Sequence, residues 1–204
     1  MNLILPNSTK VNRIIPKNAF YKRFNLNPKQ KDIFTHIIKR IQLTHTLSPH
    51  TIQVPATQSI EEIQIFKIEL RQRTYPKEVL QIIDKTISYP ILFCLEYQEQ
   101  YCYAINLKTT QDKGIYYSDW NQTIEFNFTG HNLEIIYENL VKQFINPTKT
   151  QHNLQNLVSN HKAKLELEKE IYKLKQKISK EPQLNRRINL NRELKKLETE
   201  YSQL

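Results

Sequence analysis

The sequence predicts an α+β fold: a mainly antiparallel sheet of four to five strands packed with helices, then an antiparallel helical hairpin at the C-terminus. The sheet is predicted from residues 91–95, a continuous apolar run, and from residues 101–107, which follow after a short polar turn. The hairpin is predicted from apolar residues that recur every three or four positions on both sides of Pro182. We expect an α+β domain over residues 1–146 and a coiled-coil-like hairpin over residues 147–204.

The first forty residues predict an extended segment and two helices. Residues 10–17 are expected to be extended, and Pro16 favours the start of a short helix. A second helix is predicted to begin at Asn27, because Asn is a favoured N-cap, Pro28 suits the first turn and Gln30 completes a capping box. Its buried face is predicted from apolar residues at helical spacing, namely Ile33, Phe34, Ile37, Ile38 and Ile41.

The remaining elements of this domain are predicted from alternation and from helical spacing. Residues 62–70 alternate in part and predict a strand, and Pro76 precedes an amphipathic helix. Residues 115–117 and 124–128 predict two further strands of the sheet. A closing helix is predicted from one apolar face: Leu133, Ile136, Tyr137, Leu140, Val141 and Phe144.

The C-terminal quarter contains two apolar seams at alternating three- and four-residue steps, which is the spacing of coiled coils. The candidate partner-binding residues are those of the two seams: Leu167, Ile171, Leu174, Ile178, Leu190, Leu194, Leu197 and Tyr201. Pro182 lies between the seams and breaks or kinks a helix. Two arrangements remain open, a hairpin folded on itself and a single kinked helix that dimerises.

The charge of the chain is positive and unevenly distributed. The net charge is +10, and the first forty residues contain nine Lys or Arg but a single acid, Asp32. Residues 161–204 contain twelve Lys or Arg and seven Glu, so the middle of the chain is mildly acidic. Cationic surfaces attract polyanions, of which nucleic acid is the usual one in a cell.

The candidate nucleic-acid-binding residues are the cations of these two segments: Lys10, Arg13, Lys17, Lys22, Arg23, Arg186, Arg187 and Arg192. The first five could contact phosphates, which requires only charge and reach. The tail arginines suit phosphate or carboxylate recognition equally. The alternative is that they cap a helix and pair with glutamates of the facing one, and that the rest form a solvated surface.

Several functional classes are excluded by composition. With only Gly114 and Gly130, the chain has no glycine-rich loop that could cradle a phosphate or dinucleotide. The six histidines and two cysteines lack metal-ligand spacing, so no metal and no cofactor is expected. Cys94 and Cys102 are expected to be buried, reduced thiols on adjacent strands of a cytoplasmic protein. No apolar run approaches the roughly 18 residues of a membrane span, and no signal peptide is recognised.

No catalytic constellation is found, so an enzyme is not expected. The sharpest enzyme hypothesis is a restriction-type nuclease, which needs carboxylates on neighbouring strands to hold magnesium. The nearest match is Glu69 followed by Arg71 where a lysine is expected, and Asp84 falls on a predicted helix. Trp120, beside Tyr116 and Tyr117, could stack on bases or simply cover the sheet.

Six short stretches are distinctive: residues 11–17 (VNRIIPK), 62–70 (EIQIFKIEL), 88–93 (SYPILF), 118–120 (SDW), 133–137 (LEIIY) and 180–191 (KEPQLNRRINLN). In these stretches the chain resembles a bacterial family known as domain-of-unknown-function family 4391. Pro182 departs from the charged residue expected at its place. Members of this family tend to be encoded beside helicases and DNA methyltransferases in restriction or phage-defence clusters, and no catalytic residues are established for it.

We therefore expect a non-catalytic accessory subunit of a bacterial DNA-processing or anti-phage defence complex. It would bind DNA, a protein partner (helicase, nuclease or methyltransferase), or both. Two alternatives stay open. One is a pure protein–protein assembly subunit that uses the helical tail, including homo-oligomerisation through it. The other is a divergent or degenerate restriction-type nuclease.

Overall fold

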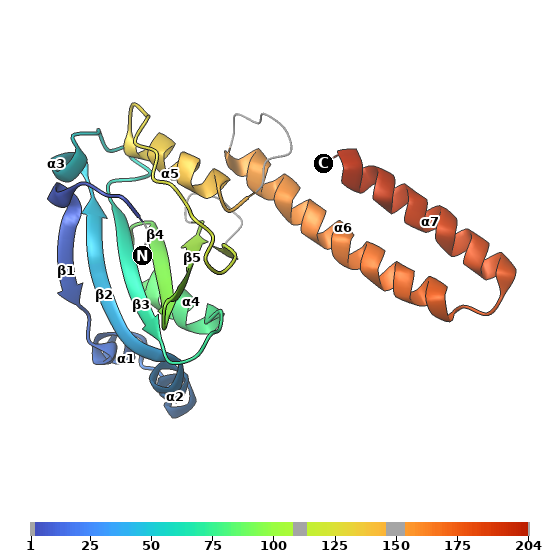
Figure 1. Ribbon diagram of the computed structural model, residues 1–204, viewed down its shortest axis with the longest axis horizontal. Coiled ribbons are helices and arrows are strands. Elements are labelled where there is room, and N and C mark those ends of the chain that lie inside the picture. The colour runs from blue at the N-terminus through green and yellow to red at the C-terminus, as the bar shows by residue number, and fades with distance from the viewer. Residues whose placement is uncertain (1–2, 108–113, 146–153, 204) are drawn as a thin grey trace. The chain divides into compact units, whose positions relative to one another are not determined.

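The computed structural model describes residues 3–107, 114–145 and 154–203, and the predicted α+β class is confirmed (Figure 1). The chain divides into two compact units, Met1–Phe144 and Ile145–Leu204. The first contains the sheet with its helices, and the second contains the two C-terminal helices. No helix in the part of the chain that is described is long and apolar enough to cross a membrane.

The sheet has six strands in sequence order, more than the four to five predicted. The strands are β1 (Lys10–Ile14), β2 (Ile38–Leu47), β3 (Ile63–Leu70), β4 (Ile91–Tyr97), β5 (Gln100–Asn106) and β6 (Ile115–Tyr117). Four neighbouring pairs are antiparallel, but β3 and β4 are parallel, so the sheet is mixed. The reason is the helix between them, α4 (Lys77–Thr86), which returns the chain to the end of the sheet where β3 began.

The largest difference from the sequence prediction is β2. The capping box of Asn27 and Gln30 is confirmed, and α2 (Pro28–Ile37) begins where expected. The helix, however, ends at Ile37, and Ile38 and Ile41 belong to a ten-residue strand rather than to the helical face. The backbone of this strand pairs with β1 on one side and β3 on the other, which satisfies both edges.

Residues 124–128 are the second difference, because they form no strand. Ile124 is buried, and the rings of Phe126 and Phe128 stack at 5.4 Å. The side-chain amide of Gln143 replaces a neighbouring strand: the Glu125 amide donates to its oxygen at 2.8 Å, and its nitrogen donates to the Glu125 carbonyl at 2.6 Å. Apolar residues therefore do alternate here, but the side chain of Gln143, and not a neighbouring strand, hydrogen-bonds the backbone of Glu125.

The N-terminal segment joins the sheet as its edge. A short 3-10 helix, η1 (Asn7–Thr9), leads into β1, whose pairing with β2 shifts register between Lys10 and Arg13. Asn12 lies in this irregularity with a φ of 53°, a left-handed value that Asn tolerates better than most residues. The helix predicted after Pro16 is present as α1 (Lys17–Phe24), and α3 (Pro49–Ile52) follows β2.

The two faces of the sheet are covered by different helices. One face forms a core cluster with α1, α2 and α4, in which Phe66 of β3 and Phe93 of β4 contact at 6.4 Å. On β4 the alternate residues Leu92 and Cys94 point to the other face, where α5 (Leu133–Lys142) packs. The hydroxyl of Tyr137 in α5 donates to the Asn106 carbonyl at 2.8 Å. The central strands are thus buried on both sides.

The second unit is a hairpin of α6 (Leu154–Lys180) and α7 (Leu184–Gln203). Glu168 accepts a hydrogen bond from Tyr201, and Lys175 pairs with Glu198 at 2.8 Å, so the helices run antiparallel. Leu167 and Leu174 are buried, and the other six seam residues are half-buried. The two seams therefore face each other within the chain, as the hairpin alternative expected.

We expect Phe34→Ala to lower the free energy of unfolding of the first unit by about 3–5 kcal/mol, the usual cost of removing a buried Phe. Phe34 is fully buried and its ring contacts Phe20 and Tyr21 of α1. Urea unfolding followed by the fluorescence of Trp120, the only tryptophan, reports on this unit. Lys29 is exposed on the same helix, so Lys29→Ala is the control and should change the free energy of unfolding by less than about 0.5 kcal/mol. Equal midpoints for the two variants would contradict this account of the core.

Candidate nucleic-acid interface

Four of the predicted cations lie on two consecutive elements near the start of the chain, β1 and α1. Lys10 and Arg13 are exposed on β1, all five residues of which are exposed. Lys22 and Arg23 are exposed in the last turn of α1. This group is called the N-terminal cation group below.

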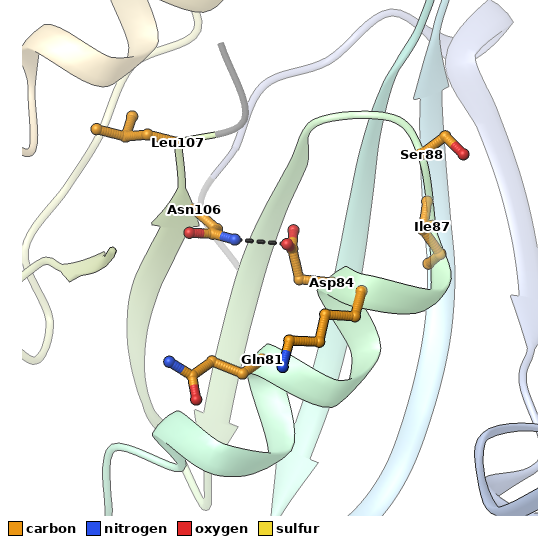
Figure 2. A pocket seen from close by; sticks show the side chains of 7 residues that line it. Gln81, Asp84, Ile87, Ser88, Asn106 and Leu107 are labelled. Atoms are coloured by element: carbon orange, nitrogen blue, oxygen red, sulfur yellow. Dashed lines mark hydrogen bonds between the residues drawn. The ribbon is translucent and has the colours of Figure 1, made fainter. Parts of the chain in front are cut away.

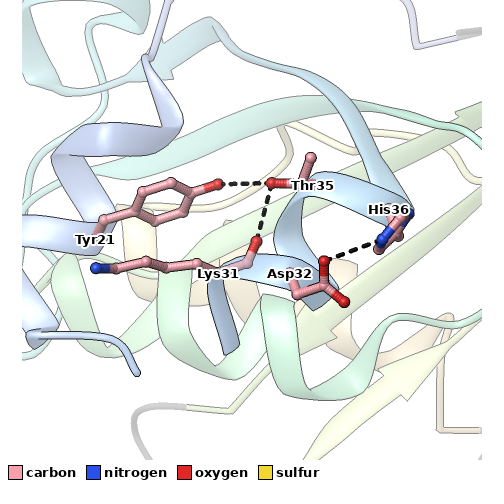
Figure 3. A network of polar contacts seen from close by, with 5 residues as sticks. All are labelled: Tyr21, Lys31, Asp32, Thr35 and His36. Atoms are coloured by element: carbon pink, nitrogen blue, oxygen red, sulfur yellow. Dashed lines mark hydrogen bonds and ion pairs between the residues drawn. The ribbon is translucent and has the colours of Figure 1, made fainter. Parts of the chain in front are cut away.

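Contacts between α1 and α2 hold α1 in place. The ring of Phe34 in α2 lies 6.1 Å from that of Phe20 and 5.7 Å from that of Tyr21. The Tyr21 hydroxyl also lies 3.4 Å from the Thr35 hydroxyl, which in turn donates to the Lys31 carbonyl (Figure 3). The cations at the end of α1 therefore project from a helix whose other side is anchored in the core.

Among the described residues, carboxylates do not neutralise the N-terminal cation group. Asp32, the only acid among the first forty residues, is paired with His36 at 3.0 Å (Figure 3). Lys39 and Arg40 are different, because both pair with Glu69, at 3.4 and 2.8 Å. In the described part of the chain, no carboxylate lies within ion-pair distance of the N-terminal cation group, nor of Lys29 or Lys31.

Lys17, which was also predicted to bind phosphate, has a structural role instead. Its side-chain ammonium donates to the carbonyl of Ile38, just beyond the end of α2. Burial lowers the pKa of Lys17, and the nearby charge of Arg71 lowers it further. Lys17 thus stabilises the junction between α2 and β2 and offers less to a ligand than its neighbours do.

Arg13 and Arg23 line one pocket of about 490 Å³. Its walls come from β1, α1, the sheet and the connection between α4 and β4. It is lined by Arg13, Ile15, Ala19, Phe20, Arg23, Leu43, Gln64, Phe66, Thr86, Ile87, Ser88 and Tyr89. The lining contains two guanidinium groups and no carboxylate, so the pocket attracts anions.

The cations of α1 also have a local effect. Lys22 and Arg23 lie at the C-terminal end of the helix, where positive charge stabilises the helix dipole by about 0.3–1 kcal/mol. That interaction explains a basic residue in the last turn, but it does not explain Arg13, which lies on a different element and faces the same pocket.

A second pocket of about 480 Å³ lies on the other side of the α4–β4 connection and shares Ile87 and Ser88 with the first. Figure 2 shows Asp84 of α4 and Asn106 of β5 pointing toward each other across it, with the amide of Asn106 donating to the carboxylate. Asp84 is only 6% exposed. This pocket is polar and contains one lysine, Lys85.

The carboxylates of the nuclease hypothesis do not meet. Asp84 lies on α4, which packs on the face of the sheet that contains Phe66 and Ile68. Glu69 is the residue of β3 after Ile68, so its side chain points to the opposite face of the sheet, where it pairs with Arg40 of β2. Burial alone would raise the pKa of Glu69, but hydrogen bonds from Arg40 and Lys39 outweigh it and hold that pKa below its ordinary value. Glu69 and Asp84 therefore cannot share a magnesium ion.

The aromatic residues predicted as a stacking site form a cluster that is largely part of the core. Tyr117 and Trp120 pack against the core cluster, and Arg73 lies over the Trp120 ring at 5.2 Å. Tyr75, which the sequence did not single out, contacts Tyr117 at 4.8 Å and is 45% exposed. The cluster covers the sheet, and Tyr75 is its accessible member.

In the hairpin, the predicted arginines lie on α7, and the exposed apolar residues lie on both α6 and α7. Arg186, Arg187 and Arg192 are all exposed there. The exposed large apolar residues of the hairpin lie away from the seam: Leu165, Tyr172, Leu184 and Ile188. Because the seam residues are used between α6 and α7, this outer set is what the hairpin leaves for another protein.

Comparison with known proteins identifies a family but no individual relative. The model of the family described as "Domain of unknown function (DUF4391)" matches residues 3–200, so the chain belongs to this family. No curated protein and no solved structure matches.

We expect neither cysteine to react with a disulfide reagent in the native protein at pH 8. Both thiols are buried and free. Burial raises the pKa of Cys102 to about 12 and also raises that of Cys94, so almost no thiolate forms. Both should react once guanidinium unfolds the chain. A native thiol that reacts quickly, with a midpoint near the ordinary thiol pKa of about 8.5, would contradict this placement.

Proposed function

We propose that the chain is a non-catalytic, nucleic-acid-binding accessory subunit of a bacterial DNA-processing or anti-phage complex. The observation that carries this proposal is the N-terminal cation group, whose members lack carboxylate partners among the residues placed by the structure. An exposed cation that has no internal partner is available for a phosphate. The overall charge of +10 adds a long-range attraction to any polyanion.

The two units support a division of roles. The first presents the N-terminal cation group on a rigid sheet edge and an anchored helix, which suits contact with a nucleic-acid backbone. The second presents exposed arginines and apolar residues on a helical hairpin, which suits contact with a helicase, nuclease or methyltransferase. The arginines of α7 could contact either a nucleic acid or a protein partner: Arg186, Arg187 and Arg192.

We expect the triple variant Arg13→Gln, Lys22→Gln and Arg23→Gln to bind DNA at least about tenfold more weakly at low salt than the unchanged chain. Each lost phosphate contact removes the release of a counterion and should reduce the slope of log affinity against log salt by roughly 0.9 for duplex DNA. Fluorescence anisotropy with labelled duplex and single-stranded DNA, at several salt concentrations, measures both quantities.

The matched control removes three charges elsewhere on the same unit: Lys77→Gln, Lys85→Gln and Lys142→Gln, on α4 and α5. It should keep most of the affinity. Equal losses for the two triple variants would mean that only the net charge matters and that no site exists. Absence of binding at low salt by the unchanged chain would overturn the nucleic-acid proposal altogether.

A second candidate is a pure protein-interaction subunit, and the outer apolar residues of the hairpin favour it. Tyr172 is 66% exposed and Leu184 is 61% exposed, and exposed apolar surface that is contiguous marks protein-interaction sites. In this case the positive charge of the hairpin would attract an acidic protein surface rather than DNA.

For this candidate we expect Leu165→Lys with Tyr172→Lys to release a co-expressed helicase, nuclease or methyltransferase partner in a pull-down, because charge would enter an apolar interface. DNA affinity of the isolated chain should not fall. Gln176→Lys, at an exposed position of the same helix, is the control for added charge. Full retention of the partner by the double variant would exclude this face as the docking surface.

A further inference from the structure

The pocket that contains Arg13 and Arg23 has two kinds of wall. Its rim includes the two guanidinium groups, which come from elements on either side of Pro16. Its floor is apolar: Phe20, Leu43 and Phe66 line it, and each is at most 5% exposed. A ligand that fills it must therefore be anionic at one end and apolar or flat at the other.

The guanidinium groups favour a phosphate as the anionic end. Arginine presents a planar fork of donors that matches phosphate oxygens, and two such forks can share one phosphate. Neither Arg13 nor Arg23 has a carboxylate within ion-pair distance among the residues that the structure places. No carboxylate of the described residues therefore competes with the ligand at this rim.

Hydroxyl groups of the α4–β4 connection, which also lines the pocket, add selectivity. Within the described chain, no hydrogen bond is formed by the side-chain hydroxyl of Ser88 or Tyr89, both of which line the pocket. By contrast, the Thr86 hydroxyl donates to Ile82 and the Gln64 amide donates to Glu62, so these two are engaged. Two hydroxyl groups thus remain to bind sugar or base atoms.

We propose that this pocket binds a nucleoside phosphate, with the phosphate between Arg13 and Arg23 and the sugar and base over the apolar floor. Its volume of about 490 Å³ is within the range of small-molecule sites, roughly 300–1,000 Å³. The ligand is a free nucleotide or the phosphate-bearing end of a strand, which share this chemistry. In its strand-end form the inference rests on the proposed nucleic-acid binding and adds to it recognition of an end.

The test compares single strands of one sequence that carry a 5′-phosphate, a 3′-phosphate or only hydroxyl ends, by anisotropy at fixed salt. We expect one of the phosphorylated strands to bind about tenfold more tightly than the hydroxyl strand, the usual value of a charge-assisted hydrogen-bond pair. Arg13→Gln with Arg23→Gln should remove that difference. Lys77→Gln with Lys142→Gln, which removes the same charge, should preserve it.

A second variant keeps both arginines and fills the pocket. Ala19 lines the pocket on the exposed side of α1, so Ala19→Leu occupies its volume without loss of charge and with little loss of helix propensity. It should also abolish the preference for a phosphorylated end while leaving the affinity for the hydroxyl strand unchanged. Thermal unfolding followed by Trp120 fluorescence confirms that each variant is folded.

Competition with free dAMP and with inorganic phosphate separates the two sources of ligand. If dAMP binds directly and no strand does, the pocket is a free-nucleotide site, and the proposed nucleic-acid function fails while this inference stands. If all strands bind equally in the unchanged protein and dAMP does not bind, the inference is overturned and the proposed function survives. Equal competition by inorganic phosphate and dAMP would also overturn it, because the apolar floor would then contribute nothing.

Discussion

The parallel pairing of β3 with β4 is the constraint on which the rest of the structure depends. Parallel neighbours cannot be joined by a tight turn, so the chain must cross one face of the sheet, and α4 makes that crossing. The face under α4 becomes the main core, and α1 and α2 pack beside it. The connection from α4 back to β4 then forms the wall shared by the two pockets. Both pockets thus depend on one topological requirement.

Much of the fold could be predicted, and the failures have a common physical cause. The capping box at Asn27 and the apolar run of β4 are local signals, and both were interpreted correctly. Ile33, Ile37 and Ile41 satisfy helical spacing, yet Ile41 belongs to a strand, because pairing with β1 and β3 decides the state of residues 38–47. Apolar residues do alternate over residues 124–128, but a strand forms only where another strand lies beside it, and that depends on the fold of the whole chain. Sequence patterns report burial better than they report hydrogen-bond partners.

The candidate site was predicted in composition but not in geometry. Charge counting identified Arg13 and Arg23, and nothing in their spacing indicated that they line one pocket. It also included Lys17, whose ammonium is used by the carbonyl of Ile38. Ser88 and Tyr89 were missed as binding residues, because a hydroxyl has no distinguishing pattern until its surroundings are known. Tyr75 was missed for the same reason: only its ring contacts with Tyr117 and Trp120 distinguish it.

The exposed edge of β1 has a consequence for solubility. A strand at the border of a sheet presents unpaired backbone groups that invite another chain to add to it, and proteins prevent this with charges and irregularities. Here Lys10 and Arg13 flank the left-handed Asn12, so charge and a backbone kink interrupt the edge together. The opposite border, β6, is protected by being only three residues long. Apolar residues at positions 10 and 13 would thus carry a risk of aggregation through this edge.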